Sequence, residues 1–166
     1  MPDEIPVITP EAMTTFYYSL GRALWSVGAL EYYLAYYLVI VLRSSFDTMD
    51  AAEKELDRAF SFTLGNLLRE FRKHRDLAPD LDRRFAAFKA ERDWLCHRMY
   101  RQNQSDLLNR NRFELVLRRL ATFKQEASAL HEILDRSFDK WSEANGITQE
   151  ELQKGIRRTI EGWRED

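Results

Sequence analysis

The sequence predicts an all-α protein, an antiparallel bundle of about four to five helices. Glycine and proline are scarce: the 166 residues contain six glycines and four prolines, and three of the prolines fall within the first ten residues. Leucine, alanine, arginine and glutamate are abundant, which favours long helices joined by short connections. A hydrophobic content of 45% and a charged content of 31% are typical of a folded protein, which we interpret as a single domain over residues 1–166.

Local signals divide this chain into helices. Thr9 is a good N-cap residue and Pro10 fits the first helical position, so the first helix should begin there. Asn145-Gly146 is a typical helix end, and the capping box that opens at Thr148 starts another helix. The expected elements are a lead at 1–8, helices at about 10–44, 50–75 (broken near residues 61–63), 79–103 and 111–144, and a short C-terminal helix within 148–166.

The first helix is apolar on most sides. Residues 23–42 contain one charged side chain, Glu31, and are nearly long enough to cross a bilayer. Four tyrosines and the charge argue against a membrane span and for a core helix that also contacts a partner subunit. We therefore predict a homodimer without membrane contact, with a membrane-associated protein as an alternative. The core stripe of this helix is expected to consist of Leu20, Leu24, Val27, Glu31, Leu34, Leu38 and Leu42.

Arg92 interrupts the apolar stripe of the third helix. Arginine cannot be neutralised, so a buried one needs an anion or a phosphate as partner. Glu31 is the corresponding misfit on the first helix and is the expected structural partner. Asp93 and His97 are i, i+4 neighbours on an adjoining face, and Tyr100 follows three residues later. The apolar residues around Arg92 on its stripe are Phe85, Phe88, Leu95, Cys96 and Met99.

Several kinds of chemistry lack a sequence signature. One cysteine and three histidines do not supply a tetrahedral zinc site, and Glu-x-x-His pairs for a di-iron bundle are absent. The chain has no glycine-rich phosphate loop and no nucleophile elbow. We therefore expect no metal and no cofactor. A single cysteine without a signal peptide indicates the reducing cytoplasm.

The net charge of −2 conceals a local basic excess. Residues 69–119 hold 14 Lys/Arg and 8 Asp/Glu side chains, whereas the remainder holds 11 and 19. This excess surrounds Arg92 and His97, as an anion-binding face requires, although a solvated basic helix surface has the same composition.

The six residues from Arg92 to His97 resemble the R-x4-6-H motif of the HEPN family, in which a polar residue such as Asp93 follows the arginine. The apolar first helix and the Leu64-Gly65-Asn66-Leu67 restart are also similar to HEPN chains. The resemblance implies a HEPN-like helical bundle that pairs as a dimer, so that two motifs face one cleft. It further implies a metal-independent endoribonuclease, in which the RNA 2′-OH attacks the neighbouring phosphate.

Carried over residue by residue, the resemblance makes His97 a general acid or base and Arg92 the group that holds the scissile phosphate. Asp93 would orient one of the two. Arg98, Tyr100 and Arg101, in the basic region beside the motif, are predicted to bind the RNA substrate.

The family also suggests a role in a toxin or defence system, with an antitoxin protein as partner. Some toxin members carry a modified tyrosine two residues after the histidine. Here that position is Met99 and the tyrosine comes one residue later, which weakens the case for that type of antitoxin. The alternative function is a HEPN-like RNA-binding or protein-interaction module without turnover, in which Arg92 and Glu31 form a structural pair.

Overall fold

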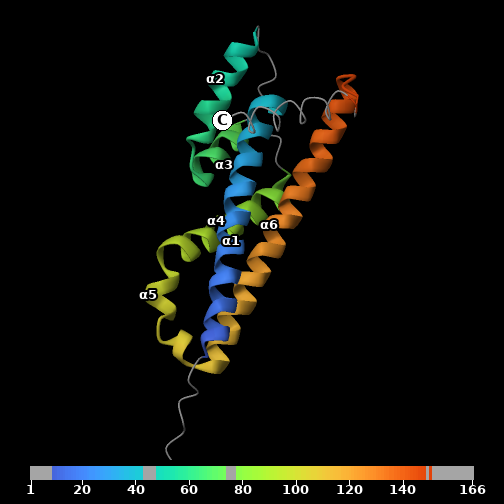
Figure 1. Ribbon diagram of the computed structural model, residues 1–166. Coiled ribbons are helices and arrows are strands. Elements are labelled where there is room, and N and C mark those ends of the chain that lie inside the picture. The colour runs from blue at the N-terminus through green and yellow to red at the C-terminus, as the bar shows by residue number, and fades with distance from the viewer. Residues whose placement is uncertain (1–8, 43–47, 74–77, 149, 151–166) are drawn as a thin grey trace, which may run out of the picture.

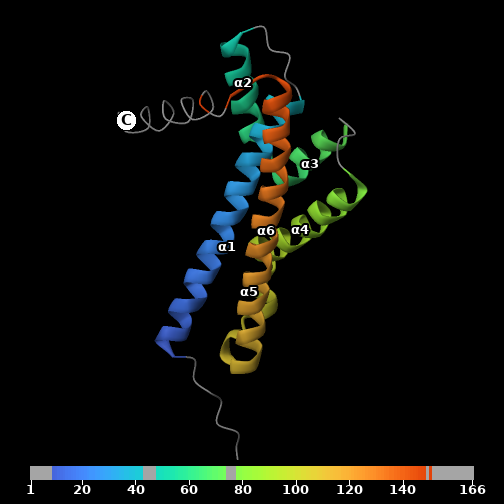
Figure 2. The same ribbon diagram turned by 90° about the vertical axis from the view of Figure 1, so that its right-hand side faces the viewer.

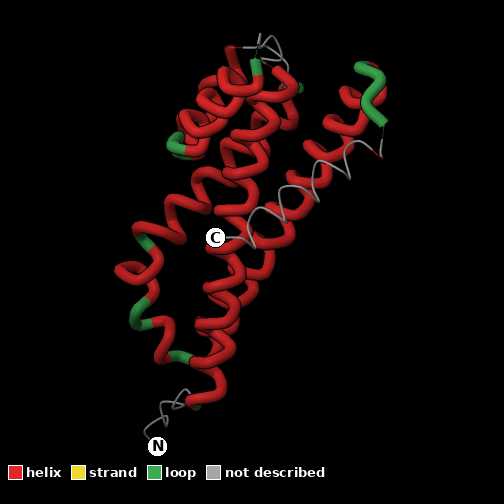
Figure 3. Tube along the Cα trace, turned by 45° about the horizontal axis from the view of Figure 1, so that its top comes forward, coloured by secondary structure: helices red, strands yellow, loops and turns green. Residues whose placement is uncertain are grey.

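The computed structural model describes residues 9–42, 48–73, 78–148 and 150, and within these ranges the chain is helical and contains no strand. The predicted all-α bundle is confirmed. Figure 3 shows helices joined by short connections. The elements are α1 (Pro10–Tyr37), the π-helical η1 (Leu38–Leu42), α2 (Met49–Phe60), α3 (Leu64–Lys73), α4 (Pro79–His97), α5 (Met99–Asn103), the 3-10 turn η2 (Asp106–Leu108) and α6 (Arg110–Ala144).

The two longest helices, α1 and α6, lie side by side (Figures 1 and 2). Phe16 contacts Phe113 near their starts, and Tyr36 contacts Phe138 near their ends, each pair with ring centroids 6.1 Å apart. These two helices therefore run in the same direction, whereas the sequence predicted an antiparallel bundle. Elements α2 to α5 carry the chain back before α6 begins, and this return makes the parallel pairing possible.

Helix α4 packs antiparallel to α6. Phe88 and Phe123 stack with centroids 4.6 Å apart, and the Arg84 guanidinium donates to both Glu126 oxygens at 2.8 and 3.0 Å. The earlier residue on α4, Arg84, contacts the later residue on α6, and Phe88 contacts the earlier one, so the two helices run in opposite directions. The fully buried side chains gather where α1, η1, α3, α4 and α6 meet: Leu30, Leu34, Leu38, Val39, Leu64, Leu67, Leu68, Phe71, Phe85, Phe88, Leu120 and Leu130.

Several helix ends form as the sequence predicts. The Thr9 hydroxyl accepts from the Ala12 amide at 3.3 Å and caps α1. Gly146 has φ of +71°, and its amide and that of Ile147 donate to the last turn of α6. This is a Schellman ending, which needs a residue without a Cβ at the left-handed position.

Two expectations need correction, and two lie outside the described residues. The helix expected at 79–103 breaks at Arg98 (φ −122°), so that α4 and α5 are separate. No proline or glycine stands there; the buried Leu95 and Met99 on either side indicate that packing bends the chain. Leu24 is 43% exposed rather than in the core, because α1 turns that side away from the bundle. The expected C-terminal helix within 148–166 and the lead at 1–8 lie outside the described residues, apart from Thr148 and Glu150.

One helical stretch, Pro10–Leu42, is long and apolar enough to cross a membrane. Length and composition alone do not distinguish a membrane helix from the core helix of a soluble protein, and here a third of the most apolar window is buried in the bundle.

Candidate functional site

Arg92 leaves α4 toward α1 and forms an ion pair with Glu31. Its Nη2 lies 3.3 Å from Glu31 Oε1, and its Nη1 donates to Asp93 Oδ1 at 3.3 Å. The Arg92 and Glu31 side chains are only 21% and 23% exposed. Each is the charged residue on an otherwise apolar stripe, so pairing removes two unpaired charges from the edge of the core.

Glu31 also fixes the start of α3. The Leu64 amide, which has no partner within its own helix, donates to Glu31 Oε1 at 3.3 Å. One carboxylate on α1 therefore contacts both α3 and α4. The next residue, Gly65, allows a close approach, because a Cβ at this position would lie 2.9 Å from Lys89 Cε.

Asp93 completes this group, which we call the Glu31 cluster: Glu31, Lys89, Arg92 and Asp93. Lys89 Nζ donates to Asp93 Oδ2 at 2.6 Å. This hydrogen bond, with a smaller contribution from Arg92, lowers the pKa of the Asp93 carboxyl below its ordinary value of 3.8. Asp93 is therefore ionised at neutral pH, with its two oxygens directed to two cations.

His97 lies apart from this cluster. It is the last residue of α4 and is exposed to solvent. Five residues separate it from Arg92, which corresponds to about 140° around an α-helix, so the two side chains leave α4 in different directions. Among the described residues no hydrogen bond joins Asp93 to His97. Within one chain the structure thus brings Arg92 and Asp93 together but not His97.

The three residues expected to bind substrate surround His97. Arg98, Tyr100 and Arg101 are all exposed, and Tyr100 is 74% exposed. The break at Arg98 starts α5 here, while Met99 between them is buried and anchors the segment. The result is an accessible imidazole beside two arginines and one phenol.

Cys96 was expected on the apolar stripe with Arg92, and this expectation was wrong. The structure leaves it exposed instead, although it lies within α4. Partial desolvation raises the pKa of its thiol, with further contributions from the Glu31 and Asp93 carboxylates. The thiol is therefore neutral at pH 7, without the lowered pKa of a nucleophilic cysteine.

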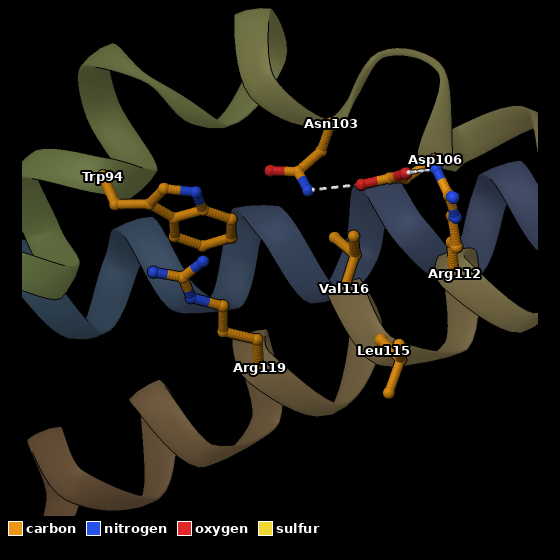
Figure 4. A pocket seen from close by; sticks show the side chains of 7 residues that line it. All are labelled: Trp94, Asn103, Asp106, Arg112, Leu115, Val116 and Arg119. Carbon is orange, nitrogen blue, oxygen red and sulfur yellow. Dashed lines mark hydrogen bonds and ion pairs between the residues drawn. The ribbon is translucent and has the colours of Figure 1, made fainter.

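A pocket of about 350 Å³ that no sequence pattern predicts lies between the end of α4, the α5–η2 turn and the start of α6 (Figure 4). Its polar lining comprises Trp94, Asn103, Asp106, Arg112 and Arg119. Trp94 is a bulky apolar residue and is 4% exposed. The other four are ordinary surface residue types from three elements, so no local pattern connects them.

In the described part of the chain, no group of three or more His, Cys, Asp or Glu side chains is arranged to bind a metal ion. Comparison with known proteins adds no assignment: no protein-family model, curated protein or solved structure matches the chain.

A double-mutant cycle tests the Glu31–Arg92 pair. Glu31→Gln keeps an acceptor for the Leu64 amide, and Arg92→Met keeps the length of the side chain. Each variant should lower the free energy of unfolding by about 1–3 kcal/mol, because it leaves a half-buried charge without its partner. The loss in the double variant should be smaller, by about 1 kcal/mol, than the sum of the losses in the two single variants. Urea unfolding measures all three free energies.

The matched control is the exposed i, i+4 pair of Lys54 and Asp50, whose nitrogen and oxygen lie 2.8 Å apart. The cycle of Asp50→Asn with Lys54→Met should show a smaller coupling, because solvent screens both charges. Additive effects at Glu31 and Arg92 would contradict the structural role of their pair.

Proposed function

We propose that the chain is a metal-independent endoribonuclease of HEPN type. The observation that carries the proposal is the accessible His97 at a helix end, with the exposed Arg98 and Arg101 beside it. An imidazole can act as a general acid or base, and arginines attract and orient phosphate. The motif that His97 completes and the local basic excess support the same assignment.

The proposed reaction uses the RNA as its own nucleophile. The ribose 2′-oxygen attacks the adjacent phosphorus while the bond from phosphorus to the 5′-oxygen breaks. His97 takes the 2′-OH proton as general base or supplies the proton to the leaving 5′-oxygen as general acid, and water makes the other of these two transfers. The products are a 2′,3′-cyclic phosphate and a free 5′-OH. This chemistry restricts the substrate to RNA.

Arg92 is proposed to stabilise negative charge on the scissile phosphate. Both of its terminal nitrogens already face carboxylates, Glu31 at 3.3 Å and Asp93 at 3.3 Å. The phosphate must therefore replace one of these carboxylates or share the guanidinium with it. Asp93 orients Arg92 rather than His97 in this arrangement, and Arg98, Tyr100 and Arg101 bind the RNA strand.

A second copy of the chain is proposed to cover the outer face of α1. Tyr18, Trp25 and Tyr32 recur every seven residues, so they share one side of this helix, and Trp25 is 81% exposed. A Cβ at Gly21 or Gly28, between these rings, would meet no atom within 4 Å. Rings from a second α1 fit such gaps as knobs fit holes.

The exposed apolar area suffices for such a dimer. Tyr17, Tyr18, Leu24, Trp25 and Tyr32 are each at least 43% exposed. From the usual size of these side chains, they offer on the order of 600 Å² per copy, close to the roughly 800 Å² per partner of a standard interface. The dimer would place the two His97 motifs within one particle, as the HEPN resemblance implies.

The resemblance extends the proposal to a cytoplasmic toxin or defence nuclease, with an antitoxin protein as a further partner. Met99, two residues after His97, is buried, and the tyrosine next to the motif, the exposed Tyr100, comes one residue later. An antitoxin that modifies a tyrosine two residues after the histidine therefore lacks its target.

One observation favours the alternative, a HEPN-like RNA-binding or protein-interaction module without turnover. The guanidinium of Arg92 is held by Glu31 and Asp93, and its Nε is buried without a hydrogen-bond partner in the described structure. Such an arginine fulfils a structural role without any substrate. In this reading His97 is an ordinary surface histidine.

The dimer predicts that Trp25→Glu converts the particle to a monomer, because it introduces a charge at the centre of the apolar face. Sedimentation equilibrium measures the mass. The control Gln125→Glu adds one charge at an exposed position of α6 and should leave the dimer unchanged. A wild-type monomer in detergent-free buffer would contradict the dimer. If the wild type binds neutral phosphatidylcholine vesicles and Trp25→Glu abolishes this binding, the face contacts a membrane instead.

The nuclease predicts that purified protein cleaves structured RNA in the presence of EDTA. His97→Ala should reduce the cleavage rate at least about a hundredfold, the usual loss on removing a general acid or base. Gel electrophoresis of end-labelled RNA follows the reaction. Because His97 is exposed, the variant should unfold at the wild-type temperature.

The matched control is His131→Ala, which removes an imidazole that packs on Tyr33 with centroids 4.2 Å apart, away from the motif. Its cleavage rate should stay at the wild-type value. Equal cleavage by wild type and His97→Ala would contradict the assignment of His97, and a folded wild-type protein that binds but does not cut RNA would favour the non-catalytic module.

A further inference from the structure

The pocket beside α4 contains two buried polar atoms without partners. Trp94 Nε1 and Asn103 Oδ1 are both inaccessible to solvent and form no hydrogen bond in the described structure. Both residues line the pocket, and Trp94 is 4% exposed overall. Buried polar groups are nearly always paired, so two orphans in one pocket point to a missing group.

The two orphans are complementary, because one is a donor and the other an acceptor. The indole Nε1 can only donate. The Asn103 amide is oriented by Asp106, whose carboxylate accepts from Asn103 Nδ2 at 2.8 Å, and this leaves the amide oxygen as the free atom. That hydrogen bond and one from Arg112 lower the pKa of the Asp106 carboxyl, which is therefore ionised and accepts only.

Trp94 and Asn103 do not satisfy each other. Figure 4 shows the Asn103 oxygen on the side of its amide that faces the indole, and the dashed line from Asn103 starts at its amide nitrogen and runs to Asp106. Because neither atom is accessible to solvent, a third group reaches them only once the Asn103 side chain turns aside. A group that accepts from Trp94 and donates to Asn103 would then complete both. Such a group presents an acceptor and an N–H or O–H donor close together on one edge.

The charges around the pocket favour a neutral ligand. Arg119 donates to both Glu91 oxygens at 2.7 and 2.9 Å, and Arg112 donates to Asp106 at 3.1 Å. Each cation thus already faces a carboxylate. A phosphate or an acidic ligand would have to displace one of these carboxylates, whereas a neutral ligand leaves both pairs intact.

The geometry also excludes stacking on the indole face beside Arg119. The Arg119 guanidinium carbon lies 3.6 Å from the centroid of the Trp94 ring and covers that face. The unpaired atom of the indole lies at its Nε1 edge, and Leu115 and Val116 offer apolar contact to a flat ring. Recognition rests on hydrogen bonds at an edge, which is how proteins distinguish nucleobases.

We propose that this pocket binds the edge of an unpaired nucleobase in the RNA strand that the protein cleaves. Nucleobase edges carry an acceptor next to an N–H donor, as the pocket requires. The choice of a nucleobase over other cyclic amides rests on the proposed RNA cleavage. Trp94 precedes His97 by about one helical turn, so a base in the pocket places its strand near the imidazole.

The indole N–H of Trp94 is a direct probe. In a ¹⁵N–¹H spectrum of the full-length protein, the four tryptophans give separate indole signals, and Trp94→Phe identifies the one that belongs to Trp94. Titration with each of the four ribonucleosides should move this signal saturably for at least one of them. If a nucleoside with a ring N–H binds, its analogue with a methyl group on that nitrogen, such as N3-methyluridine or 1-methylguanosine, should not bind.

Calorimetry on the variants completes the test. Trp94→Phe should weaken nucleoside binding about five- to thirtyfold, because it removes one hydrogen bond and leaves the ligand acceptor unpaired. The control Trp141→Phe removes an indole on α6, outside the pocket, and this variant should bind the nucleoside as the wild type does. A single-stranded oligoribonucleotide should bind more tightly than its nucleoside; a nucleoside that binds while the oligonucleotide does not would overturn the assignment to an RNA strand.

The result that overturns the pocket is a Trp94 indole signal that no nucleoside moves up to millimolar concentrations. This outcome is separable from failure of the nuclease. RNA cleavage without nucleoside binding would refute only the nucleobase site. Nucleoside binding without RNA cleavage would refute only the catalytic role of His97.

Discussion

The ion pair between Arg92 and Glu31 is the interaction on which the arrangement of the candidate site depends. It joins α4 to α1, and the same Glu31 oxygen caps α3 at the Leu64 amide. Once Arg92 faces α1, helical geometry fixes its neighbours. Trp94 lies about 200° around the helix and faces α6, and His97 lies about 140° away and points to solvent. The pair therefore orients both the exposed imidazole and the pocket.

Local signals in the sequence were sufficient for most of the fold. The cap at Thr9, the break near residues 61–63 and the ending at Gly146 depend on residues within a few positions of each other, and all are present. The parallel pairing of α1 with α6 depends instead on how the elements between them, from η1 to η2, return the chain. The bend at Arg98 likewise has no glycine or proline and reflects tertiary packing around Met99.

In the candidate site too, some features follow from the sequence and others depend on tertiary packing. Glu31 and Arg92 are visible in the sequence because each is a charge on an apolar stripe, and charges there need partners. The pocket is not visible, since Asn103, Asp106 and Arg119 are common polar residues that only the packing of α5, η2 and α6 brings to Trp94. Its main signal, an indole N–H and an amide oxygen that lack partners, exists only in three dimensions.

The central claim is that the RNA 2′-OH is the nucleophile, so a single-atom change in the substrate tests it most directly. The cleavage site is first mapped on a defined RNA in EDTA, and the ribose on the 5′ side of that site is then replaced by 2′-deoxyribose. The account predicts that this position is no longer cut, while the unmodified RNA yields a fragment that ends in a 2′,3′-cyclic phosphate. Cleavage at the unchanged position of the deoxy-substituted strand would contradict it.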